Sequence, residues 1–214
     1  MTSLLHIDAS ARPGRSDRVP HGSHTRRLTA RFVERWNALR PGGELIRRDV
    51  GLHPPAPVTG EWIHAAFTPD SAREPWMHKV LAESDSLVDE LLRAELIVIG
   101  APMYNFGLPA QLKAYVDNIV RVGRTFGFDR SREGVPYWPL LAGRGIRVAV
   151  LSSRGDYGYA EGERFAHLNH AEPGLRAALG YLGNTEVESG AAEYAECADE
   201  RLAASIARAE AAVD

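Results

Sequence analysis

The sequence predicts an α/β fold in which helices cover both faces of a parallel β-sheet. Short apolar runs alternate along the chain with segments whose apolar residues recur every three or four positions. The run at 95–100 shows no apolar–polar alternation, which is typical of a strand buried on both faces, and 145–151 is a second run of this kind. The 214 residues are 44% hydrophobic and contain no linker or repeat, so residues 1–214 are expected to form a single domain.

Apolar spacing and helix breakers define the elements of the first half. The run 4–7 predicts a buried strand, and a helix begins near Thr25 and ends before a Pro-Gly-Gly sequence. Residues 44–50 are partly polar, as an edge strand is. The stretch 51–76 is rich in proline and is expected to hold one short helix near 61–67. Both a binding element and a plain surface insertion remain open for this stretch.

The second half continues the alternation. Residues 77–92 predict an amphipathic helix, and after the strand at 95–100 Pro109 stands where the first residue of another helix is expected. The remaining elements are a strand at 145–151, a helix at 168–182, a strand at 185–189 and a helix at 199–213. This order predicts a doubly wound parallel sheet, and five strands favour the flavodoxin-like order 2-1-3-4-5 over a six-stranded dinucleotide-binding fold.

Composition and charge exclude several classes of protein. A net charge of -3 and a pI of about 6.2 do not match a nucleic-acid or anionic-membrane binder. No apolar run reaches the ~18–20 residues that span a membrane. The only cysteine, Cys197, cannot form an internal disulfide and no signal peptide is recognisable, so a cytoplasmic protein is expected. The histidines form no zinc motif and no GxSxG elbow exists, so neither a metal site nor a catalytic triad is expected.

In an open α/β sheet, ligands bind outside the carboxyl ends of the strands, which directs attention to the loops 8–24, 101–108 and 152–161. In the first loop, Ser23 or Thr25 is a natural N-cap of a helix whose start suits a phosphate. Ser10 could donate to the same anion, although capping alone is the alternative. No GxGxxG or GxxxxGK[ST] motif is present. The arginines of this loop and helix leave open both a solvated surface and a role toward an anionic cofactor.

The second loop has the composition of a strip that receives a flat aromatic ligand. Pro102 is rigid, Met103 and Phe106 are apolar, Tyr104 is amphipathic, and Asn105 carries both a donor and an acceptor. Such a strip suits a ring with an alternating polar edge, for example an isoalloxazine, although a structural loop packed on the next helix is the alternative. In the third loop, glycines permit close backbone approach, and hydroxyls and Arg154 could hold the other side of the ring.

These residues give the chain its resemblance to a known family. The sequence Ala-Pro-Met-Tyr-Asn-Phe at 101–106 is followed by Gln-Leu-Lys at 111–113, Tyr-Val-Asp at 115–117 and Gly-Arg-Thr-Phe at 123–126. Together with the Ser-Arg-Gly turn at 153–155, they resemble the FMN-dependent NAD(P)H azoreductases and quinone reductases of the flavodoxin-like superfamily. The resemblance extends over most of the chain.

The resemblance implies a homodimer that binds FMN tightly and reduces quinones or azo compounds with NADH or NADPH, by ping-pong hydride transfer through the flavin. No side chain is then needed as a catalytic acid or base. Phe128 is a candidate for the pocket wall over the flavin, and Tyr159 is a further candidate for the substrate pocket. The implied cofactor-binding residues are Ser10, Ser23, His24 and Thr25 at the phosphate, Pro102, Met103, Tyr104, Asn105 and Phe106 along the ring, and Ser153, Arg154 and Gly155 at its pyrimidine edge.

Some segments depart from the family pattern. Asp156 stands where the family commonly has a second glycine, aromatic residues are added at 135–141, and the first loop is longer. These loops are expected to shape the outer pocket. The departures therefore do not change the prediction of FMN, but they leave the identity of the aromatic electron acceptor undetermined. The alternatives are a specialised biosynthetic reductase acting on a polyaromatic intermediate and a non-enzymatic flavin-binding or electron-transfer module. Electron-transfer flavodoxins tend to be strongly acidic, which the net charge of -3 does not match.

Overall fold

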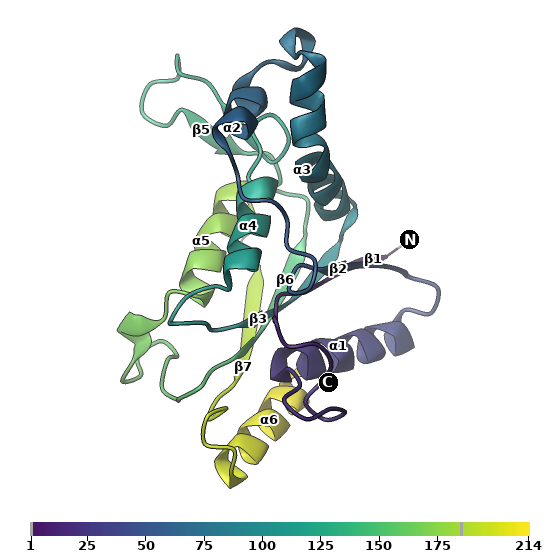
Figure 1. Ribbon diagram of the computed structural model, residues 1–214, viewed down its shortest axis with the longest axis vertical. Helices are drawn as coiled ribbons and strands as arrows, with labels where there is room; N and C mark the ends of the chain where they lie inside the picture. The colour runs from purple at the N-terminus through teal and green to yellow at the C-terminus, as the bar shows by residue number, and fades with distance from the viewer. Residues whose placement is uncertain (1, 185) are drawn as a thin grey trace.

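The computed structural model describes residues 2–184 and 186–214, and it confirms the predicted flavodoxin-like sheet (Figure 1). All pairs in its five-stranded sheet are parallel and the order is β2-β1-β3-β6-β7, which is 2-1-3-4-5 when its strands are counted in sequence. The strands are β1 (Ser3–Asp8), β2 (Glu44–Asp49), β3 (Leu96–Pro102), β6 (Arg147–Ser153) and β7 (Val187–Ala192).

Helices cover both faces of this sheet. They form two groups on opposite faces, as Figure 1 shows. The first face is covered by α1 (His24–Leu39) and α6 (Glu200–Val213), and the second by α3 (Pro75–Arg93), α4 (Ala110–Ile119) and α5 (Glu172–Leu182). Because consecutive strand residues point to opposite faces, Leu4 packs into the core under α1 while Leu5 packs into the larger core under α3, α4 and α5.

The parallel register brings the ends of three strands to one edge of the sheet. Asp8 at the end of β1 is paired with Gly100 in β3, and Pro102 at the end of β3 is paired with Ser153 in β6. The strand order reverses between β1 and β3, since β2 lies beyond β1 on one side and β6 lies beyond β3 on the other. The loops that follow these strands therefore meet where ligands of doubly wound sheets bind.

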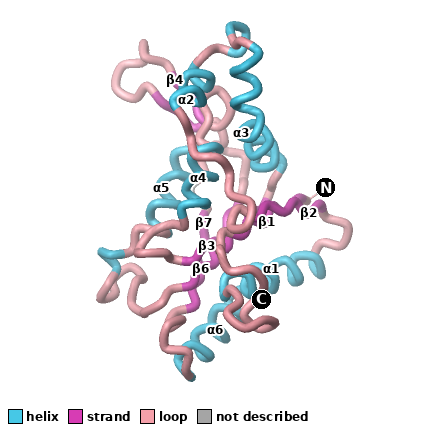
Figure 2. Tube along the Cα trace, in the orientation of Figure 1, coloured by secondary structure: helices cyan, strands magenta, loops and turns pink. Residues whose placement is uncertain are grey.

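The structure contains a small second sheet that the sequence did not predict. The strands β4 (Phe126–Phe128) and β5 (Tyr137–Pro139) form an antiparallel hairpin far from the edge where β1, β3 and β6 end (Figure 2). The helix α2 (Gly60–Phe67), expected within 51–76, is confirmed and packs on α3. The segment that precedes α2 is held against α4, because the side chain of Asn118 donates a hydrogen bond to the carbonyl of Ala56.

Several predicted boundaries differ by a few residues. Pro109 is the N-cap of α4 and not its first residue. The helix expected from 168 begins at Glu172, because residues 166–168 form a 3-10 turn and Asn169 Oδ1 accepts from the N–H of Ala171. The strand expected at 185–189 is found as β7 from Val187 to Ala192, and its predicted start, Thr185, lies outside the described residues. No helix of the described ranges is long and apolar enough to cross a membrane.

Candidate functional site

A cavity of about 320 Å³ opens at the sheet edge where β1, β3 and β6 end. It is formed by all three predicted loops and by the loop that follows β7. Its lining residues are Ser10, Arg12, Ser23, His24, Pro102, Met103, Tyr104, Asn105, Ser153, Gly155, Ala195 and Glu196. Nine of the residues predicted to bind a cofactor are in this set, so the structure brings most of the predicted site together.

The first wall of the cavity is the start of α1. Ser23 is the N-cap, and its hydroxyl accepts from the N–H of Arg26 and lies 2.9 Å from the hydroxyl of Thr25. The first N–H groups of a helix have no partner within the helix and carry a partial positive charge. The buried Ser10 lines the same cavity, and its oxygen accepts from the N–H of Arg12, which leaves its proton available to a ligand. This end of the cavity is therefore built to receive an anion.

The second wall is a tight turn at Tyr104–Gly107. Tyr104 and Gly107 exchange two backbone hydrogen bonds of 3.0 Å, and the central residues, Asn105 and Phe106, have φ angles of 48° and 70°. Positive φ is uncommon for any residue other than glycine and is a strained state for phenylalanine. The strain is held in place because the carbonyl of Phe106 also accepts from the N–H of His170. Within the described residues, the N–H groups of Asn105 and Phe106 have no acceptor, so they remain available to a ligand.

Two side-chain contacts join the second wall to the first loop. The hydroxyl of Tyr104 accepts from the N–H of Ala11 at 3.2 Å. Gln111, in the first turn of α4, donates to the carbonyl of Ala9 at 3.2 Å. The glutamine at 111 thus joins α4 to the segment that follows β1.

The third wall combines the turn after β6 with the loop after β7. The N–H groups of Ala195 and Glu196 donate to the carbonyls of Arg154 and Gly155. A Cβ atom at Gly155 would lie 2.6 Å from Oε1 of Glu196, so any other residue here would displace the Glu196 side chain. The close approach of backbone here is consistent with the predicted contact to a flat ligand.

Three predicted cofactor residues lie outside the cavity. The side chain of Arg154 is buried in ion pairs with Glu172 and Glu193, which hold it on the far side of its turn. Thr25 is fully buried behind Ser23. Phe106 is 46% exposed, because the left-handed turn directs the chain away after Asn105. For Arg154 the sequence could not reveal Glu172 and Glu193, which are distant along the chain.

Both predicted substrate-pocket residues also lie away from this cavity. Tyr159 is buried beside Arg154 and Phe165. Phe128 belongs to the β4–β5 hairpin, where it stacks on Tyr137 and meets Phe67 edge-on. Phe128 therefore does not contribute to the cavity at the sheet edge of its own chain.

The structure adds three lining residues that the sequence did not assign. Arg12 is one of the arginines of the first loop, and nothing in its spacing distinguishes it from Arg15 or Arg18. Ala195 and Glu196 follow the last strand, β7, which ends at the same edge as β6. Applying the sheet-edge rule to the fifth strand as well would have found them.

His24 is the titratable group in the cavity whose environment is most altered. Burial, followed by the positive charges of Arg12 and Arg27, lowers the pKa of His24 below its ordinary value of about 6.5. Its Nδ1 is buried and, among the described residues, has no hydrogen-bond partner. The ring of His24 therefore lies close to the positive charges of Arg12 and Arg27 and to the N-terminus of α1, surroundings that favour an anion. In the described ranges, no group of three or more His, Cys, Asp or Glu could hold a metal ion.

The fold and the cavity define a protein of the flavodoxin-like class, and comparison with known proteins agrees. The family described by a flavodoxin-like fold matches residues 2–214. An FMN-dependent NADH:quinone oxidoreductase 2 of Idiomarina loihiensis is 42% identical over 209 residues, which cover 98% of this chain and 86% of that protein. An FMN-dependent NAD(P)H:quinone oxidoreductase 1 of Pseudomonas aeruginosa is 41% identical, with 92% and 89% coverage. The chain belongs to the family of FMN-dependent NADH:quinone oxidoreductases, which confirms the resemblance found in the sequence.

Solved structures support the same fold. An FMN-dependent NADH-azoreductase from Bacillus anthracis strain Ames Ancestor, in complex with FMN, has a TM-score of 0.82 and 20% identity, covering 100% of this chain and 98% of the other. An azoreductase from the Sterne strain of that organism has a TM-score of 0.81 and 21% identity, with 100% and 99% coverage. At these identities the likeness shows the fold alone.

The lowered pKa of His24 predicts a pH-dependent stability of the ligand-free protein. Between the folded and unfolded pKa values the unfolded state binds more protons, so the free energy of unfolding falls as pH drops through about 6.5. In urea denaturation, the free energy of unfolding should fall more between pH 7.5 and pH 5.5 for the wild type than for His24→Gln. His21→Asn is the control, because His21 is exposed in the same loop and asparagine tolerates its positive φ. Its free energy of unfolding should fall as much as that of the wild type. Equal losses in wild type and His24→Gln would contradict the assignment.

Proposed function

We propose that the protein is an FMN-dependent NAD(P)H:quinone oxidoreductase whose FMN lies in the cavity at the sheet edge. The observation that carries the proposal is the cavity itself. It is lined both by the start of α1, which suits an anion, and by the Tyr104–Gly107 turn, where the N–H of Asn105 is unpaired among the described residues. The names of the family relatives, which describe NADH and NAD(P)H quinone oxidoreductases, support the activity.

The residues present fit the phosphate of FMN. His24 offers an orphaned ring nitrogen, Ser10 a free hydroxyl proton, and α1 its first N–H groups. Arg12 lines the cavity, and its guanidinium makes no ion pair or hydrogen bond within the described chain. Arg12 and the helix start would together balance the negative charge of the phosphate.

The residues also fit the isoalloxazine ring. Pro102 and Met103 offer an apolar strip, and the free N–H of Asn105 would meet the polar edge of the ring. The glycine at 155 leaves room for the opposite edge. When bound, FMN supplies the redox chemistry, accepting a hydride from a nicotinamide and passing electrons to a quinone or azo acceptor. The side chains of this chain orient the ring and stabilise its charge.

The activity is tested with the purified protein. Its visible spectrum should be that of a flavin, and NADH or NADPH added without oxygen should bleach it. A quinone or an azo dye should then restore the colour, and steady-state turnover should follow ping-pong kinetics. A protein that binds FMN but oxidises neither nicotinamide with any acceptor would contradict the enzymatic proposal and favour an electron-transfer module.

Substitutions at Asn105 test the placement of the ring. Asn105→Leu both removes the amide and opposes the left-handed backbone, so it should weaken FMN retention strongly. Asn105→Gly keeps the backbone conformation and removes only the side chain, so its loss should be smaller. Flavin content after gel filtration measures both. Full flavin content in Asn105→Leu would place the ring elsewhere.

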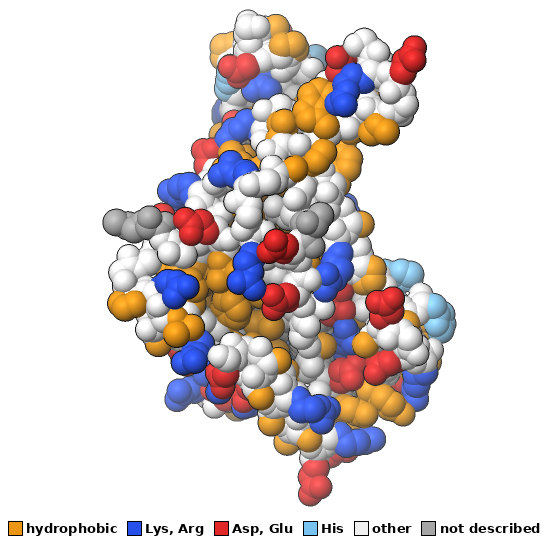
Figure 3. All heavy atoms as spheres, turned by 180° about the vertical axis from the view of Figure 1, so that it is seen from behind, with side chains coloured by type: hydrophobic (Ala, Val, Ile, Leu, Met, Phe, Trp, Pro, Cys, Tyr) orange, Lys and Arg blue, Asp and Glu red, His pale blue; other side chains and the backbone are white. Residues whose placement is uncertain are grey.

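The structure also supports a homodimer. Phe67, Phe128, Tyr137 and Tyr181 form an aromatic surface on α2, the β4–β5 hairpin and α5, with 52% of Phe67 and 43% of Tyr137 exposed. In Figure 3 hydrophobic side chains gather near the top of the molecule, between its two upper lobes. Exposed apolar surfaces of this kind commonly mark interfaces. In a homodimer Phe128 would reach the cavity of the second subunit, which reconciles its predicted role with its distance from its own cavity.

Disrupting the aromatic surface tests the dimer. Wild-type protein should elute and scatter light at twice the 23.4 kDa mass of the chain. The double variant Phe67→Glu, Tyr137→Glu should be monomeric, should retain FMN, and should lose turnover because the acceptor pocket is incomplete. Leu39→Glu, an exposed apolar position on α1, is the matched control and should remain dimeric. A monomeric wild type with full turnover would contradict the proposal.

A further inference from the structure

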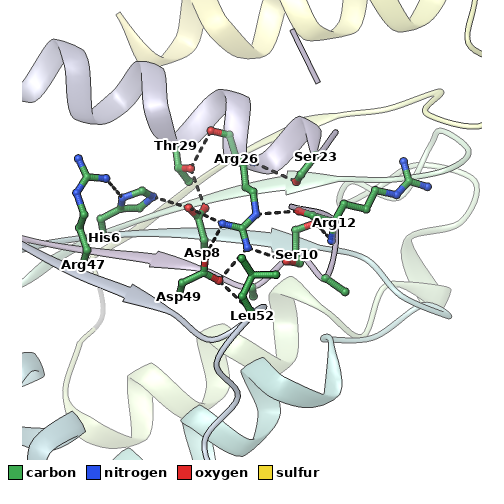
Figure 4. A network of polar contacts seen from close by, with 12 residues as sticks. His6, Asp8, Ser10, Arg12, Ser23, Arg26, Thr29, Arg47, Asp49 and Leu52 are labelled. Carbon is green, nitrogen blue, oxygen red and sulfur yellow. Dashed lines mark hydrogen bonds and ion pairs between the residues drawn. The ribbon is translucent and has the colours of Figure 1, made fainter. Parts of the chain in front are cut away.

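A second arginine, Arg26, lies directly behind the anion end of the cavity and makes no part of its lining. Its guanidinium donates to the carbonyls of Ser10 and Arg12, both at 2.9 Å, and forms a bidentate ion pair with Asp49 at 2.7 and 2.8 Å (Figure 4). Arg26 is 8% exposed, and it reaches from α1 across to the ends of β1 and β2. One side chain thus joins the cavity loop, the helix and the edge strand.

The charge of Arg26 is already balanced. Asp49 pairs with it bidentately, and Asp8 lies 3.4 Å from the same guanidinium while also accepting a hydrogen bond from the hydroxyl of Thr29. Burial opposes the charged form, but the hydrogen bonds that Arg26 donates to Asp49 and the negative charge of Asp8 raise the pKa of Arg26. With two carboxylates facing it, Arg26 contributes little net positive charge to the cavity. Arg12, which has no such partner among the described residues, contributes that charge.

We propose that Arg26, held by Asp49, is a positioning residue that fixes the Ser10–Arg12 segment in the shape that receives the FMN phosphate. The proposal rests on the proposed function and assigns different tasks to two arginines. Arg12 supplies charge to the phosphate directly. Arg26 acts through the backbone, because its two carbonyl contacts orient the segment that carries the hydroxyl of Ser10 and the side chain of Arg12.

The geometry requires an arginine at this position. A guanidinium has five donors in a fixed planar arrangement, and here they serve two carbonyls and both oxygens of Asp49. A lysine has three donors at a single point and cannot satisfy the carboxylate bidentately while reaching both carbonyls. Arg26→Lys is therefore expected to behave as a loss of positioning even though it keeps the charge.

The test compares FMN with riboflavin, which has the same ring and no phosphate. Flavin-free wild type, Arg26→Lys, Arg26→Met and Asp49→Asn are titrated with each flavin by fluorescence quenching. The FMN dissociation constant should rise about tenfold or more in the Arg26 variants, since two hydrogen bonds that shape the loop are lost. It should rise less in Asp49→Asn, which leaves the carbonyl contacts of Arg26 in place, and riboflavin affinity should be unchanged throughout. Arg31→Met is the control, because Arg31 lies on α1 but pairs with Asp214 at the chain end.

Salt dependence separates the two arginines. Arg12→Met should weaken FMN binding and also reduce its dependence on ionic strength, because a direct charge contact is removed. The Arg26 variants should weaken FMN binding with the salt dependence of the wild type. Equal weakening of FMN and riboflavin in Arg26→Lys and Asp49→Asn, with lowered melting temperatures, would overturn the proposal in favour of a general structural role. Unchanged FMN affinity in all three variants would also overturn it, whereas a wild type that binds neither flavin would refute the proposed function itself.

Discussion

The parallel pairing of β1, β3 and β6 is the constraint on which the site depends. Because the register places Asp8 beside Gly100 and Pro102 beside Ser153, three loops must leave the sheet at one edge. Each loop is then tied to its neighbour by a small number of specific contacts: Met103 donates its N–H to the carbonyl of Ser153, and the hydroxyl of Tyr104 accepts from Ala11. The sheet supplies the location of the cavity, and these contacts supply its shape.

The elements and their order could be predicted from the sequence because they are coded locally. The buried run at 95–100, the N-cap at Ser23 and the proline before α4 are each readable within a few residues. The β4–β5 hairpin was not predictable in this way. Its strands have three residues each, they are separated by a glycine-containing loop, and their pairing is antiparallel with no apolar alternation long enough to register.

The candidate site was predictable in its location and only partly in its membership. Composition and the sheet-edge rule selected the loops, and the resemblance selected residues within them. The direction of a side chain depends on partners that are distant along the chain. Arg154 illustrates this, since Glu172 and Glu193 draw it into the protein and away from the cavity. Arg12 illustrates the opposite case: its side chain has no ion pair among the described residues, and it lines the cavity.

Arg12 and Arg26 show how one residue type serves different physical purposes. A buried guanidinium must be paired, and the charge of Arg26 is balanced within the protein by Asp8 and Asp49. Its planar set of hydrogen-bond donors then holds backbone carbonyls in place, here those of Ser10 and Arg12. A guanidinium that is to bind a ligand anion must instead be left unpaired at the surface of a cavity, as Arg12 is. Since Arg26 donates to the carbonyl of Arg12, the paired residue orients the segment on which the unpaired one is carried, and the strength of the anion site depends on both.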